Sequence, residues 1–95
     1  RMAIAEAYLL AQNMKAAEEV MEWIAQQRIR DLEYLNARPP KFQQLLFPQI
    51  SEAVEDLERL QVHFQKHFAN STVLATIETN LPKWKTQLGL PKDQR

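Results

Sequence analysis

The chain has 95 residues, in which 12 Lys and Arg balance 12 Asp and Glu, with one Gly, five Pro and no Cys. This is the length of one small domain with a single core, and the apolar share of 45% is typical of a folded protein. The single Gly excludes glycine-rich phosphate loops, and the lack of Cys excludes disulfides, thiolate zinc sites and cysteine nucleophiles.

Residues 2–37 are predicted to be helical, because the segment contains neither Gly nor Pro and strong helix formers dominate it. Its apolar residues follow one another at steps of three or four, which places them on one side of a helix. This predicted core stripe consists of Ala3, Ala7, Leu10, Met14, Ala17, Met21, Ala25, Ile29, Leu32 and Leu35.

We expect residues 2–37 to form one long helix, with a helical hairpin broken near Gln12 and Asn13 as the alternative. The segment from Ala7 to Ala17 resembles the inner turn of a tetratricopeptide repeat. Gln12 stands where that family has Gly, and no second copy follows at the period of that repeat.

Pro39 and Pro40 end the first helical segment, because proline lacks a backbone N–H and displaces the preceding residue from the α region. Ser51 is predicted to cap the next long helix, and Pro82 and Gly89 to mark the start and end of the last one. The helices predicted after this break are 41–47, 50–69, 71–80 and 82–88, followed by a tail at 89–95.

No segment alternates apolar and polar residues for long, so we expect an all-α protein. The predicted fold is a small helical bundle, one domain over 1–95, in which a long N-terminal helix lies antiparallel to a second long helix and short C-terminal helices close the core. No run of about 18 apolar residues and no secretory leader is visible, so we expect a cytoplasmic protein without a membrane partner.

Few residues suit catalysis or metal binding. His63 and His67 are spaced so that one helical face offers both imidazoles, but Arg59, one turn earlier, is a cation that would repel a metal. Ser51 and Ser71 are better suited to capping helices than to nucleophilic attack. We therefore expect no enzymatic activity, no metal or other cofactor, and no small-molecule substrate.

A second apolar band on the first helical segment predicts a protein interface. This band lies about 140° around the helix from the core stripe, so two layers are needed to cover both. Either the short helices wrap both bands, or one band remains as a docking surface for another chain or a second copy of this one. Aromatic residues with a polar tip are enriched at interface hot spots. The predicted interface residues are Met2, Leu9, Val20, Trp23 and Tyr34.

Two clusters of basic residues carry the alternative function, a small subunit of a nucleoprotein complex that contacts the nucleic-acid backbone without sequence preference. The residues concerned are Arg28, Arg30, Arg38, Lys41, Lys83, Trp84 and Lys85. Small helical subunits of CRISPR effector complexes have this size and character, which is an analogy of architecture without a shared motif. The pI near 6.9 is unlike that of a free-standing nucleic-acid binder, so a protein interaction or assembly module is the preferred prediction.

Overall fold

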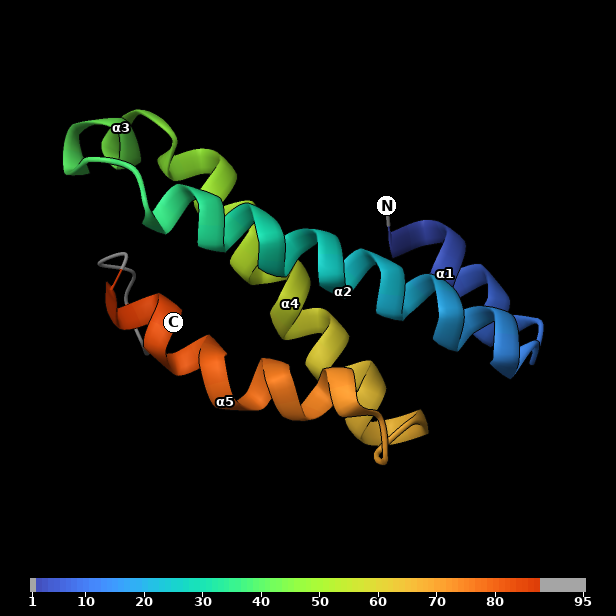
Figure 1. Ribbon diagram of the computed structural model, residues 1–95. Helices are drawn as coiled ribbons and strands as arrows, with labels where there is room; N and C mark the ends of the chain where they lie inside the picture. Colours follow the sequence, from blue (N-terminus) through green and yellow to red (C-terminus); the bar gives the residue numbers. More distant parts are fainter. Residues whose placement is uncertain (1, 88–95) are drawn as a thin grey trace.

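Helices make up the fold of the computed structural model, which describes residues 2–87 and contains no strand in that range. The helices are α1 (Met2–Leu10), α2 (Met14–Asn36), α3 (Pro40–Leu45), α4 (Phe47–His67) and α5 (Thr72–Gln87). The long helices α2 and α4 run in opposite directions, and α5 returns alongside them (Figure 1). The predicted all-α bundle with two long antiparallel helices is confirmed.

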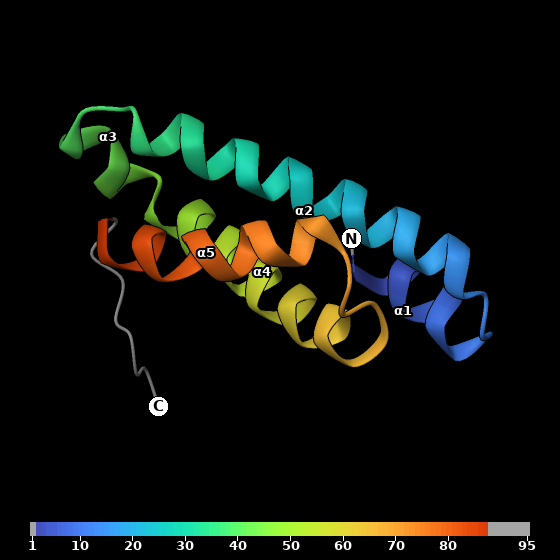
Figure 2. The same cartoon turned by 60° about the horizontal axis from the view of Figure 1, so that its bottom comes forward.

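The chain turns back between α1 and α2, so one uninterrupted helix over 2–37 is wrong and the hairpin is the arrangement found. The turn depends on Gln12, whose φ of 60° lies in the left-handed region that favours glycine. Asn13 then caps α2, because its side chain accepts a hydrogen bond from the N–H of Ala16 at 3.4 Å. Folding back lays α1 along the first half of α2 and buries Ala5 in the core (Figure 2).

The helix α4 begins at Phe47, three residues earlier than predicted. Pro48 occupies its first turn, where the missing N–H would have no partner within the helix in any case. Ser51 therefore lies inside the helix, and its predicted role as an N-cap is wrong.

The helix α5 runs through Pro82, so the two short helices predicted at 71–80 and 82–88 are one helix. Ile77 and Leu81 before the proline and Trp84 after it all point into the core. Their burial outweighs the hydrogen bond that Pro82 denies to the carbonyl of Glu78. Gly89 and the predicted tail at 89–95 lie outside the described residues.

The core lies between α2, α4 and α5, with α1 adding Ala5 at one end. Its largest fully buried side chains are Phe64, Met21, Leu32, Ile50, Leu57, Leu60 and Ile77. No helix within residues 2–87 combines the length and the apolar character needed to cross a bilayer. One face of α2 is therefore fixed by this core, and its opposite face is left free to carry a site.

Candidate protein-interaction surface

The face of α2 that points away from the core carries two exposed aromatic side chains. Trp23 and Tyr34 are each 62% exposed. They are separated by three helical turns, so they lie on the same side of α2 at about 16 Å from each other along the axis. We call this face, with Gln27 and Arg30 between the two aromatic residues, the α2 ridge. Since Met21 and others fix the opposite face in the core, the ridge is held on a rigid element.

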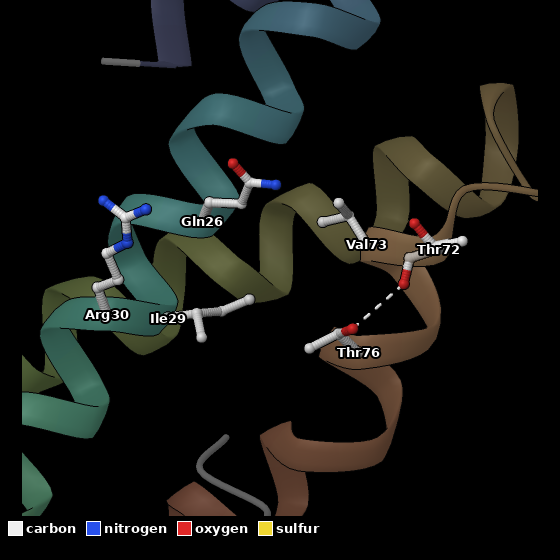
Figure 3. Close-up of a pocket in the computed structure, with 6 residues that line it drawn as sticks. All are labelled: Gln26, Ile29, Arg30, Thr72, Val73 and Thr76. Atoms are coloured by element: carbon white, nitrogen blue, oxygen red, sulfur yellow. Dashed lines mark hydrogen bonds between the residues drawn. The ribbon is translucent and has the colours of Figure 1, made fainter.

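A groove between α2 and α5 borders one side of the α2 ridge and has a volume of about 380 Å³. The groove is lined by Gln26, Ile29, Arg30, Thr72, Val73 and Thr76 (Figure 3). Ile29 extends toward α5, whereas the guanidinium of Arg30 turns away from it (Figure 3). The hydroxyl of Thr76 donates to the carbonyl of Thr72 at 3.2 Å, which keeps that side chain against its own helix. The groove combines an apolar floor with a polar rim, which suits an inserted side chain of a partner.

A second groove of about 280 Å³ borders the other side of the α2 ridge, between α2 and the start of α4. Its lining is Arg28, Asp31, Tyr34, Leu35, Leu46, Gln49 and Glu52. The guanidinium of Arg28 lies 3.5 Å from the carboxylate of Asp31. Arg30 thus belongs to the ridge and to the first groove, and Tyr34 to the ridge and to the second. The α2 ridge therefore adjoins a groove on each side and shares one residue with each of them.

The five predicted interface residues do not share one surface. Trp23 and Tyr34 stand on the α2 ridge, whereas Leu9 and Val20 are half-buried and pack against the core. The side chain of Met2 lies outside the described residues. Of the four predicted residues whose side chains the structure describes, two are therefore presented to solvent.

Three residues of the predicted nucleic-acid set are engaged within the fold. Trp84 is only 6% exposed and belongs to the core, so its ring is not available to stack on a base. The ammonium of Lys85 lies 2.6 Å from the carboxylate of Glu58, and Arg28 is beside Asp31. The proposed stacking role of Trp84 is therefore incompatible with its position.

The other basic residues of that set are exposed. Arg30 lies on the α2 ridge, Arg38 and Lys41 lie where α2 passes into α3, and Lys83 lies near the end of α5. Both views place α3 and the C-terminal end of α5 at the same end of the molecule (Figures 1 and 2). The two basic clusters therefore approach one end of the bundle, although Lys85 is paired there.

Sequence reasoning missed the exposed apolar residues near the middle of the chain, in α3 and at the start of α4. Phe42, Leu45 and Phe47 are all exposed, with Leu45 at 75%, and α3 buries none of its residues. A helix of six residues next to prolines is too short to show a periodic pattern, so no interior or exterior face could be read from it. The signal available was the run of apolar residues in a segment without acidic ones.

One polar cluster joins α1 to α4. The carboxylate of Glu6 lies 3.0 Å from the guanidinium of Arg59 and 3.3 Å from Nε2 of His63. His67 instead lies beside the ring of Phe68, with 6.0 Å between the ring centroids. Among residues 2–87, no group of three or more His, Cys, Asp or Glu is placed to hold a metal ion.

No family model matches this chain, and neither a curated protein nor a solved structure does. The functional interpretation of the surface therefore depends on its own residues. The features that need explanation are exposed aromatic side chains on a helix whose other face is fully packed.

Proposed function

We propose that this protein is a non-catalytic interaction or assembly module that binds another protein chain through the α2 ridge and its two grooves. The observation that carries the proposal is the exposure of Trp23 and Tyr34, both 62%, on one face of a rigid helix. Large aromatic side chains with a polar tip supply much of the binding energy at protein interfaces when they enter a partner's pocket. Their rigid support lowers the entropy that binding would cost.

Site-specific photo-crosslinking tests the proposal directly. A photoreactive amino acid replaces Trp23 or Tyr34 in the protein, which is expressed in cells of the organism it comes from. Thr79, an exposed residue of α5, serves as the matched control position. We expect covalent adducts to a second polypeptide from positions 23 and 34 and none from position 79. Equal adducts from all three positions, or none from 23 and 34, would contradict the proposal.

A nucleoprotein subunit is the second candidate function, because Arg38, Lys41 and Lys83 are exposed at one end of the bundle. Its test is fluorescence anisotropy with labelled single-stranded and duplex oligonucleotides at about 50 and about 200 mM salt. Binding through several phosphates would weaken by orders of magnitude over that range. No binding at the lower salt concentration would dismiss this candidate.

A further inference from the structure

The passage from α2 to α3 gathers cations over exposed aromatic rings. The guanidinium carbon of Arg38 lies 4.6 Å from the centroid of the Tyr34 ring, and the ammonium of Lys41 lies 5.5 Å from that of Phe42. Leu45 lies one turn after Phe42 on the same side of α3. We call these five residues the basic–aromatic corner. It continues the α2 ridge, with which it shares Tyr34.

The five residues of the corner carry two positive charges and no negative one. Residues 34–51 contain Arg38 and Lys41 and no Asp or Glu. Of the nearby acidic residues of α2, Asp31 is beside Arg28, and Glu33 points about 100° away from Tyr34 around the helix. Glu52, the first acidic residue after this segment, lines the second groove together with Tyr34. Within residues 34–51 themselves, an approaching anionic group meets two cations and no carboxylate.

The corner is held in shape before any partner arrives. The side-chain amide of Gln43 donates to the carbonyls of Asn36 at 3.3 Å and Arg38 at 3.0 Å, which ties α3 to the end of α2. Leu46, directly after α3, packs against the core. Binding would therefore not have to order this part of the backbone.

We propose that the basic–aromatic corner binds an acidic peptide segment of a protein partner, with carboxylates on Arg38 and Lys41 and an apolar side chain against Phe42 and Leu45. This inference rests on the proposed function and names the chemistry of the partner. Charge complementarity favours an acidic segment, and the apolar area beside the cations favours one that also carries an apolar anchor.

A peptide fits the corner better than a nucleic acid does. Backbone binding of nucleic acid gains affinity with the number of phosphates that are neutralised, and it normally uses an extended basic stripe. Here the net charge is zero, Trp84 is buried, and Lys85 is paired with Glu58. Two cations beside an apolar patch match the needs of a short acidic segment.

The experiment selects peptides from a random phage-displayed library on the immobilised protein and measures the binding of the selected peptides to variants. Arg38→Glu combined with Lys41→Glu reverses the charge of the corner. Lys15→Glu combined with Lys66→Glu changes the net charge equally at exposed positions on α2 and α4. Circular dichroism and urea unfolding confirm that each variant is folded.

We expect selected peptides that are rich in Asp and Glu next to Leu or an aromatic residue, with affinity at least about tenfold weaker for the corner variant and little changed for the control pair. Selected peptides without acidic enrichment, or no selected peptides at all, would overturn the inference. If peptide binding instead fails only with Trp23→Ala, the inference falls while the proposed interaction function stands. If the protein binds labelled oligothymidine and the corner variant does not, the corner binds nucleic acid and the peptide proposal is wrong.

Discussion

At the scale of single residues, two tryptophans show how position decides the role of a side chain. Trp23 stands on the α2 ridge with 62% of its surface exposed, and Trp84 is inside the core with 6% exposed. Both occur on helices among lysines, glutamines or glutamates, so their neighbours in sequence do not separate them. The difference arises from the phase of each helix relative to the core.

The same substitution at the two positions should have unequal effects on folding. Trp84→Ala removes a buried ring and leaves a cavity, so we expect a loss of about 3–5 kcal/mol in the free energy of unfolding. Trp23→Ala removes a ring that faces solvent, so we expect a change within about 0.5 kcal/mol. Urea unfolding followed by far-UV circular dichroism measures both values. A comparable large loss for the two variants would show that Trp23 belongs to the core and would remove it from the α2 ridge.

Gln12 holds a backbone conformation that costs an L-amino acid free energy. Its φ of 60° is accessible to glycine without a clash with the side chain, so we expect Gln12→Gly to raise the free energy of unfolding by about 0.5–1 kcal/mol. The control is Gln26→Gly, in the middle of α2, which should lower it by about 1 kcal/mol because glycine disfavours a helix interior. Chemical denaturation of the two variants and of the unaltered protein measures these changes in the free energy of unfolding. A loss of stability with both variants would indicate that the turn at Gln12 is not strained.

At the scale of helices, α5 shows that core packing can override local sequence preference. Proline at position 82 removes one helical hydrogen bond, yet the buried positions Ile77, Leu81 and Trp84 keep their helical spacing across it. Asn80 donates its side-chain amide to the carbonyl of Thr76 at 2.9 Å, which supplies a further bond near the proline. The helix therefore continues through Pro82 at a cost in the free energy of folding.

Replacing Pro82 should make the protein more stable. Pro82→Ala restores the missing N–H, and we expect the free energy of unfolding to rise by up to about 3 kcal/mol. Pro48→Ala is the matched control, because Pro48 lies in the first turn of α4, where no helical hydrogen bond is missing. Thermal and urea unfolding of both variants test this. If Pro82→Ala gains no more than Pro48→Ala, the proline does not strain α5.

Apolar periodicity predicted the buried face well within a single continuous helix. It predicted that face poorly where the chain turns back or where a helix continues through a proline. Ala17, Met21 and Leu32 of the predicted core stripe are buried, whereas Leu10 is 87% exposed because α1 folds back after it. Trp84 belongs to the alternative nucleic-acid set as a ring that stacks on a base, and this alternative treats the last helix as one that starts at Pro82. Once α5 is continuous, the spacing from Ile77 points Trp84 inward.

The candidate surface was predictable to a similar extent. The far side of the first helical segment already marked Trp23 and Tyr34, since their phase around α2 does not depend on the break before it. The exposure of Phe42 and Leu45 was not predictable. It follows from the position of α3, which contacts the rest of the bundle through α4 and leaves one side uncovered.

At the scale of the whole molecule, the bundle is elongated, because the α1–α2 hairpin extends past the other helices (Figure 2). The principal extents are 43 × 25 × 20 Å, and the radius of gyration of 13.8 Å exceeds the value of about 12 Å expected for a compact chain of this length. The helix α1 packs on α2 and is tied to α4 through Glu6. Its stability should therefore be lower than that of the helices that surround the core.

Hydrogen exchange should show this gradient. We expect the amides of α1 to exchange faster than those at the centres of α2 and α4, because Ala5 is the one residue in the buried core among the α1 side chains that the structure describes. Glu6→Gln should increase exchange in α1 by up to about fivefold, as its partners are half-exposed and such pairs contribute little each.

The control is Glu55→Gln, which changes an exposed carboxylate of α4 and should leave exchange in α1 unaltered. Mass spectrometry of peptides from the exchanged protein resolves the two helices. Protection of α1 equal to that of α2 would show that the hairpin and the core open together.

The double use of α2 has a consequence for how this surface can change over evolutionary time. The same helix fixes the core with one face and presents Trp23 and Tyr34 with the other. Inserting or deleting one residue between them would turn half of the helix by about 100° and expose its core positions. The distance and direction between the two aromatic side chains are therefore inherited as a unit. A change of this surface that preserves the core is therefore limited to exchanging side chains at these positions, because altering their spacing would move core residues to the surface.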